Sequence, residues 1–300
     1  MKTLMAAILL GAAFGHVMRM AQGGKCRMLW VGAVNYISAC VMSVIAWRLA
    51  FRVPLGPHEV AYGIVGGASW AMSYLLLDGG IRLAGVSITQ CVGWLGIAVP
   101  VPLSALFFGE ALNGSQYAGL AAMVVALFLL APGETSNVRQ KSRWAVPALL
   151  GVFASEGVIC MAMKGFEVSL KSHGAELQDV DSRIPGLLIF LFGAAGTGLL
   201  AIGILRRIRP AGRDVGYGIG LGATAFLGNL AFMRAVNRIP APVMFPGYWA
   251  GVIVVTGIAS MLLWRERYRF RAWLGMFAAL LTMIFVSVDV FGLLRNALAR

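Results

Sequence analysis

Charged residues are scarce in this chain of 300 residues: only 12% of its side chains are Asp, Glu, Lys or Arg, whereas 59% are hydrophobic. A soluble domain usually carries about a quarter of its residues as charged side chains. Twelve acidic and 25 basic residues are too few to cover a globule in water. The shortage excludes a soluble enzyme and a disordered chain, and it predicts an integral membrane protein built from α-helices.

Cysteine and histidine are also few, with four and three residues. Four cysteines, three of them inside apolar segments, do not make the framework of a disulfide-stapled secreted protein. No pair of cysteines has the spacing of metal ligands. We therefore expect neither a metal nor another cofactor.

The net charge of +13 raises the question of nucleic-acid binding. The basic residues, however, occur in short groups between apolar runs, and no basic face is long enough to follow a duplex. Basic residues at the ends of membrane spans meet anionic lipid headgroups. The predicted partner is therefore the lipid bilayer and not a nucleic acid. These groups are Lys25/Arg27, Arg139/Lys141/Arg143, Arg206/Arg207/Arg209/Arg213 and Arg265/Arg267/Arg269/Arg271.

A membrane-spanning helix needs about 20 mostly apolar residues. That criterion predicts ten spans and a multi-pass protein of the plasma (cell inner) membrane. Lys164 is expected to close span six and to reach the headgroups, and the polar stretch 164–183 is expected to be a solvated loop. The predicted spans are about 3–22, 28–51, 59–77, 83–108, 115–132, 143–164, 185–205, 214–234, 241–263 and 270–293.

An internal repeat relates the two halves of the chain. The segment from Tyr62 to Ser69 (YGIVGGAS) returns as the segment from Tyr217 to Thr224 (YGIGLGAT), 155 residues later. The same offset places Trp94 on Trp249, and with one extra residue Glu110 falls on Glu266. The chain thus divides into two repeats, 1–137 and 138–300, with five predicted spans each.

Because five is odd, the second repeat must enter the membrane from the side opposite to the first. Two inverted repeats are an architecture of secondary transporters, whose substrate site lies near the midplane between the repeats. Connections on one side carry 15 Lys and Arg residues against 10 on the side of the termini. The positive-inside rule would place the termini outside, but the margin depends on the helix ends, so the orientation stays open.

Two ionisable residues lie deep inside predicted spans. An ionisable side chain is costly to bury in a membrane, so its presence there indicates a functional role. Glu156 lies about twelve residues into span six without a basic residue within one turn. We expect it either to carry a proton during transport or to serve as a structural carboxyl group. His16, in span one, is the second group that could titrate near neutral pH, and its alternative role is simple packing.

Aromatic and amide side chains gather in spans three, four, eight and nine. Trp70 and Tyr74 lie one turn apart, and Gln90 and Trp94 share a helix face by the same spacing. Such faces suit the apolar surfaces and hydroxyl groups of a sugar-like or amphipathic solute, although ordinary helix packing explains each residue alone. The candidate residues of a substrate cavity are His16, Trp70, Tyr74, Gln90, Trp94, Asn229, Tyr248 and Trp249.

Prolines interrupt two spans that the repeat relates to each other. Pro100 and Pro102 lie in span four, and Pro246-Gly247 lies in span nine. Proline removes an intrahelical hydrogen bond, and breaks in equivalent spans indicate a binding site in transporters. These four residues are therefore predicted helix breaks.

The ten spans in two inverted halves, with Phe-Phe-Gly109-Glu110 after span four and Trp-Arg-Glu266 after span nine, resemble the drug/metabolite transporter superfamily (EamA-like carriers). Asn-Arg-Ile-Pro-Ala at 237–241 and the long connection after span six resemble its rhamnose/glucose-type members. The resemblance implies a carrier, not an enzyme, whose cavity is lined by spans one, three, four, six, eight and nine. Its substrates range from sugars to amino acids and drugs, so the cargo stays open.

Other classes fit the sequence less well. An exporter of drugs or amino acids shares all these features. A lipid flippase needs basic groups at midplane, and the arginines lie at span ends. An intramembrane enzyme needs clustered Asp or a Ser/His pair, whereas the close pair Asp179/Asp181 lies in the predicted loop. No channel filter is visible. The oligomeric state stays open.

Overall fold

The computed structural model describes residues 2–51, 53–84, 103, 106, 112–130, 145–264 and 270–288. Within these residues the protein contains nine α-helices, one short π-helix and no strand. Six of the described helices are long and apolar enough to cross a membrane. The chain is therefore an all-α, multi-pass integral membrane protein, as its composition predicts.

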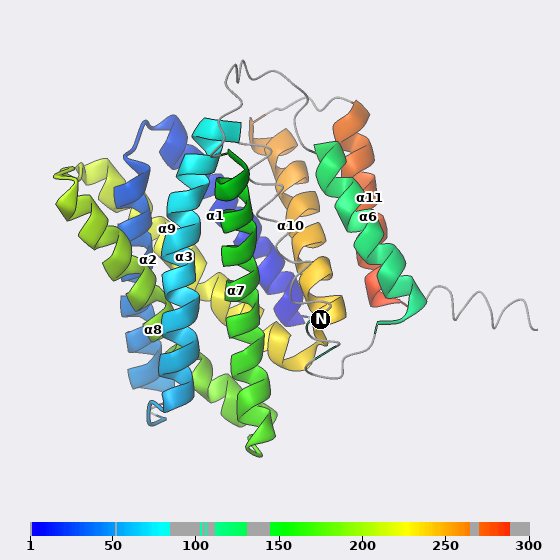
Figure 1. Cartoon of the computed structure of the whole chain (residues 1–300), viewed down its shortest axis with the longest axis horizontal. Helices are drawn as coiled ribbons and strands as arrows, with labels where there is room; N and C mark the ends of the chain where they lie inside the picture. Colours follow the sequence, from blue (N-terminus) through cyan, green and yellow to red (C-terminus); the bar gives the residue numbers. More distant parts are fainter. Residues whose placement is uncertain are drawn as a thin grey trace, which may run out of the picture. The chain divides into compact units, whose positions relative to one another are not determined.

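The helices follow the predicted spans (Figure 1). Nine of the ten predicted ranges overlap a helix, and most of the range 83–108 lies outside the described residues. The helices are α1 (Lys2–Gly23), α2 (Met28–Ala46), η1 (Trp47–Phe51), α3 (Pro57–Ala84), α6 (Gly114–Leu130), α7 (Ala145–Ser172), α8 (Leu177–Leu205), α9 (Gly212–Arg238), α10 (Ala241–Trp264) and α11 (Phe270–Ser287).

Local sequence explains where the helices begin and end. α3 starts at Pro57, since a proline at the first helical position loses no hydrogen bond. α7 ends before Gly174, whose φ of +85° suits glycine. The N–H groups of His173 and Ala175 both donate to the Leu170 carbonyl, which satisfies one of the last carbonyl groups of α7.

The helices form two compact units. The first consists of Met1–Met72 and Val158–Arg238. Within it, α2 packs against α8 and α9, and α1 packs against α9 (Figure 1). Its core is formed by aliphatic and aromatic side chains from α1, α2, α7, α8 and α9.

Glycines allow two close helix contacts in this unit. A Cβ atom added to Gly63 of α3 would lie 2.5 Å from the Cβ atom of Phe190 on α8. One added to Gly218 of α9 would lie 2.6 Å from the Cβ atom of Val34 on α2. Small residues four apart let helix backbones approach in this way.

The glycine four residues further along each helix repeats the pattern. A Cβ atom on Gly67 would overlap the Leu191 carbonyl group, and one on Gly222 would overlap the Ser38 hydroxyl group. The glycines of α3 and α9 are 155 residues apart, and the residues that they contact are 153–156 residues apart. The helix pairs α3–α8 and α9–α2 thus pack through matching glycine faces. Gly63 and Gly67 form the glycine face of α3, and Gly218 and Gly222 form that of α9.

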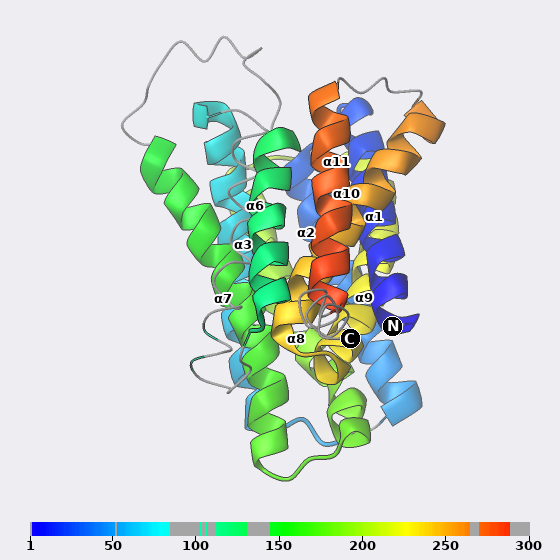
Figure 2. The same ribbon diagram turned by 90° about the vertical axis from the view of Figure 1, so that its right-hand side faces the viewer.

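The second unit consists of Ser73–Gly157 and Ile239–Arg300. Within it, α6 lies beside α11, and α10 packs against both (Figure 2). Their shared core is small and apolar, and Trp249, Val254 and Met283 pack around it. The core residues are Met123, Ala126, Ala250, Ile253, Ala278 and Ala279.

The prediction of a loop over 164–183 is wrong. α7 continues to Ser172 and α8 begins at Leu177, so only four residues connect them. Lys164 does not close the helix: it is 2% exposed, and its Nζ atom lies 2.8 Å from Oε2 of Glu167. Oε1 of Glu167 also lies 2.5 Å from Nζ of Lys171. Ion pairs at helical spacing thus carry the helix past the apolar run.

The acidic pair of that predicted loop lies at the start of α8. The Asp179 carboxylate accepts the backbone N–H of Glu176 at 3.1 Å, which completes a capping box. Asp181 accepts hydrogen bonds from Asn237 and Arg238 of α9. Both carboxylates thus serve helix capping and packing.

The predicted break at Pro246-Gly247 does not end a helix, because α10 runs through both residues from Ala241 to Trp264. Both residues are buried. Pro246 lacks the N–H group that would donate to the residue four before it, yet the helix continues to Trp264. A single missing hydrogen bond is tolerated in apolar surroundings when neighbouring helices cover it.

Candidate functional site

Glu156, the candidate for proton coupling, lies on α7 and accepts a hydrogen bond from α3 within the second unit. The Ser73 hydroxyl group donates to Oε1 of Glu156 at 2.7 Å. Ser73 is 4% exposed. A hydroxyl group can donate to a carboxylate and accept from a carboxylic acid, so this pair can persist in either protonation state.

Close packing of α3 and α7 surrounds that pair. A Cβ atom on Gly151 would lie 2.8 Å from a methyl carbon of Leu76, one turn beyond the pair. The Ser155 hydroxyl group donates to the Gly151 carbonyl at 2.8 Å and is satisfied within its own helix. Tyr74, a predicted cavity residue, directly follows Ser73 and is half-buried.

Trp70 lies one turn before Tyr74 on α3 and joins an aromatic cluster in the first unit. Its ring is stacked 5.7 Å from that of Tyr36 and 5.5 Å from that of Phe192, measured between centroids. Phe192 is fully buried. One face of Trp70 is thus fixed by helices α2 and α8, an arrangement that holds the indole ring rigid.

His16 and Asn229 lie on α1 and α9, which pack against each other. His16 is buried, at 8% exposure, as expected for a histidine deep in a span. The Asn229 side-chain N–H donates to the Ala225 carbonyl of its own helix at 2.9 Å. The amide oxygen of Asn229 can still accept a hydrogen bond.

Tyr248 and Trp249 lie on α10 in the second unit and contact each other edge to face, with ring centroids 5.1 Å apart. Trp249 also packs against the core shared by α6, α10 and α11. Gln90, Trp94, Pro100 and Pro102 lie outside the described residues. The contacts therefore join the candidates in small groups, each within its own unit.

Three partners in these groups are absent from the sequence prediction: Tyr36, Ser73 and Phe192. Each is an ordinary residue of an apolar span. Their roles depend on how α3 is placed against α2, α7 and α8. No single-sequence signal distinguishes them from packing residues.

A pair of buried carboxylates caps α3 and α9 at equivalent positions. Oε2 of Glu59 accepts the backbone N–H of Gly56 at 2.9 Å. Oδ2 of Asp214 accepts the backbone N–H of Ala211 at 2.8 Å. Both acids are 1% exposed and lie at the third position of their helices. Glu59 and Asp214 are 155 residues apart, which is the offset of the sequence repeat.

Each carboxylate also holds a neighbouring connection. Oε1 of Glu59 accepts from the Arg183 guanidinium group at 2.8 Å, and Oδ1 of Asp214 accepts the backbone N–H of Arg27 at 3.0 Å. The Arg183 side chain lies 3.5 Å from the Pro54 carbonyl, and the Arg27 side chain donates to the Arg209 carbonyl. Pro54 and Arg209 are again 155 residues apart. The spacing of acids in the two segments, visible in the sequence, could have revealed this pair.

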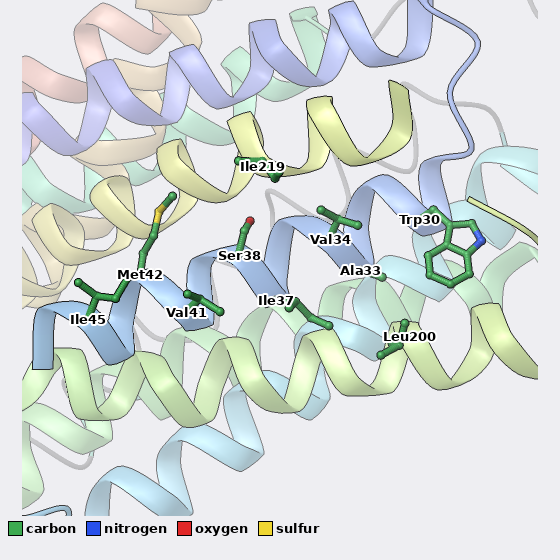
Figure 3. Close-up of a pocket in the computed structure, with 10 residues that line it drawn as sticks. All are labelled: Trp30, Ala33, Val34, Ile37, Ser38, Val41, Met42, Ile45, Leu200 and Ile219. Atoms are coloured by element: carbon green, nitrogen blue, oxygen red, sulfur yellow. The ribbon is translucent and has the colours of Figure 1, made fainter. Parts of the chain in front are cut away.

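An open groove of 440 Å³ follows α2 where α8 and α9 flank it (Figure 3). Ser38 is the one hydroxyl group in its lining, and it donates to the Asn35 carbonyl at 3.0 Å. Such a groove suits an acyl chain better than a polar solute. The lining residues are Trp30, Ala33, Val34, Ile37, Ser38, Val41, Met42, Ile45, Leu200 and Ile219.

Comparison with known protein families finds no matching family. The chain is similar to an uncharacterized protein of Haemophilus influenzae, with 24% identity over 292 residues that cover 93% of this chain and 95% of the relative. A protein of known crystal structure has the same fold, with a TM-score of 0.78 and 14% identity, and the similarity covers 97% of each chain. The structural similarity therefore covers nearly the whole chain.

Proposed function

We propose that this protein is a secondary-active carrier of a small polar or amphipathic metabolite, with sugar-like solutes favoured. It crosses the cell inner membrane ten times as two inverted five-helix repeats of the drug/metabolite transporter type. The repeats alternate between two states that open a central site to one side of the membrane at a time.

The matching contacts of α3 and α9 are the observation that carries this proposal. Glycine faces, capping carboxylates and the loops that these carboxylates hold recur at the offset of 155 or close to it. In a ten-span chain the Pro54 and Arg209 connections lie on opposite sides of the membrane. Equivalent contacts on opposite sides are what inverted repeats require.

Proton coupling through Glu156 is part of the proposal. Glu156 lies in the middle of α7, and its described partner is a neutral hydroxyl group, 2.7 Å away, and not a cation. A carboxyl group paired with a hydroxyl group can gain and lose a proton without breaking an ion pair. That property is needed if protonation is to accompany each transport cycle.

Transport by purified protein in liposomes tests both parts. A thermal-shift screen against sugars, amino acids and cationic drugs selects the solute, and its uptake is measured with and without an imposed pH gradient. We expect saturable uptake with counterflow, accelerated by the gradient. Glu156→Gln should keep counterflow and lose the acceleration, whereas Glu176→Gln, which changes an exposed acid between α7 and α8, should behave like the wild type.

Each other result has a definite meaning. If Glu156→Gln keeps gradient-driven uptake, the proton role is lost and the carrier remains. Flux without counterflow indicates a channel, and product formation without movement of solute indicates an enzyme. Faster uptake into inside-out vesicles than into right-side-out vesicles indicates an exporter of drugs or amino acids, the alternative that shares this architecture.

A further inference from the structure

Two of the three histidines in the chain meet at one end of the first unit. His58 is the second residue of α3, and His173 directly follows α7. Their ring centroids are 5.2 Å apart, with 56° between the ring planes. His58 is half-buried and His173 is exposed, so a solute in water can reach the pair.

Ser169 orients both rings. Nδ1 of His173 lies 2.7 Å from the Ser169 carbonyl oxygen, and Nδ1 of His58 lies 3.0 Å from the Ser169 hydroxyl oxygen. A carbonyl group only accepts, so Nδ1 of His173 carries the hydrogen atom, and the Nε2 atom of the neutral ring keeps its lone pair. Because both Nδ1 atoms face Ser169, both Nε2 atoms face away from it.

This arrangement fits a shared metal ion. Metal-binding histidines usually donate their second N–H to a carbonyl group, as His173 does. Two imidazole rings on one tetrahedral zinc ion, with bonds of about 2.0–2.1 Å, have centroids about 5 Å apart. The observed separation of 5.2 Å matches that distance.

Nearby carboxylates pair with the neighbouring cations and so reduce their repulsion of a metal ion. Lys171 lies 2.5 Å from Glu167 and donates to the Asn237 carbonyl. Arg183, at the start of α8, is bound to Glu59 at 2.8 Å. Glu167 also pairs with Lys164, so two carboxylates offset two of the three cations before a metal ion arrives.

We propose that His58 and His173 form a binding site for a divalent transition metal such as Zn²⁺. Among the described residues no group of three metal-ligating side chains occurs, so the protein supplies two imidazole ligands and water completes the shell. The ion connects the first turn of α3 to the end of α7. This site is separate from the proposed transport site and does not depend on it.

Calorimetric titration of the full-length protein with Zn²⁺, after removal of any affinity tag, tests the proposal. We expect one ion per chain and a rise in Tm at saturation. His58→Gln and His173→Gln should each abolish the stoichiometric binding, and Ser169→Ala should weaken it about tenfold through lost orientation. His16→Gln, which removes the third histidine, should leave the affinity unchanged.

Cu²⁺ provides a second readout, because its electron paramagnetic resonance spectrum reports bound imidazole nitrogen atoms. We expect two nitrogen ligands in the wild type and one in His173→Gln. Because His173 is exposed, this substitution should not disturb folding. Absence of stoichiometric Zn²⁺ binding to the wild type overturns the proposal. So does binding that survives both histidine substitutions.

Discussion

Asp214 binds both the start of α9 and the connection between α1 and α2. Its buried carboxylate accepts two backbone N–H groups, from Arg27 and Ala211. Asp214→Asn replaces one acceptor with a donor that faces other donors, so we expect a loss of about 1–3 kcal/mol, measured as a lower Tm in detergent.

Asp179→Asn is the matched control for that change. Asp179 occupies the same helical position in α8 and also accepts one capping N–H, but it is exposed to solvent. Water can replace its hydrogen bond, so we expect a small change in Tm. Equal losses for the two variants would show that burial of Asp214 contributes nothing.

Cys26, between α1 and α2, responds to the same carboxylate. Burial raises the pKa of the Cys26 thiol, the charge and hydrogen bond of Asp214 raise it further, and Arg213 lowers it. A raised pKa means less thiolate at a given pH, and only the thiolate is alkylated. In a variant with Cys26 as its one cysteine, Asp214→Asn should move the pH profile of iodoacetamide labelling to lower pH.

Arg213→Ala should move the same profile to higher pH, since it removes the cation that favours the thiolate. Shifts of opposite sign distinguish electrostatic control from a general loosening of the loop, which would accelerate labelling in both variants. Labelling profiles that coincide in all three proteins would contradict the role of Asp214.

At the scale of helices, the glycine faces of α3 and α9 set how closely their partners approach. Gly67→Ala and Gly222→Ala place a methyl group where Leu191 or Ser38 already lies. We expect each to cost about 1–3 kcal/mol through overpacking. Gly216→Ala, on α9 with no atom within 4 Å of its added methyl group, should instead stabilise by up to about 1 kcal/mol. Thermal unfolding in detergent measures all three.

The sequence predicted the helices wherever a long run of apolar residues marks them. Nine ranges overlap a helix because backbone hydrogen bonds must be satisfied inside a membrane. The prediction failed at 164–183, where paired charges at helical spacing continue α7 beyond its apolar part. Apolar length alone does not detect such pairs.

The candidate site was less predictable than the helices. Glu156 stands out in the sequence because charged residues are rare inside the predicted spans, and Trp70 stands out because Tyr74 follows it by one helical turn. Their partners, Ser73 and Phe192, depend on the register between helices distant in the chain. Register depends on packing of whole helix faces, which one sequence does not reveal.

At the scale of the whole molecule, inverted repeats predict that equivalent loops face opposite sides of the membrane. In a cysteine-free background, single cysteines at Lys25 and Ser172, both exposed, should differ in labelling by a membrane-impermeant maleimide on intact cells. Only one of them should react before lysis, and both should react after it.

Arg207→Cys serves as the matched position for Lys25→Cys, because the contacts of Asp214 join the two loops. It should label from the same side as Lys25→Cys. Labelling of Lys25→Cys and Ser172→Cys from the same side would refute the inverted arrangement.

The ion pairs of α7 also bear on how the chain enters the membrane during synthesis. Lys164, Glu167 and Lys171 lie within two helical turns, so their charges are partly neutralised before any other helix arrives. A lone charge costs about 2.5–3.5 kcal/mol at the centre of an inserting helix and less toward its ends, where Lys164, Glu167 and Lys171 lie in α7. Loss of Glu167 leaves two ammonium groups uncompensated, whereas loss of Lys164 leaves one pair intact. We therefore expect loss of Glu167 to impair insertion by the translocon more than loss of Lys164 does.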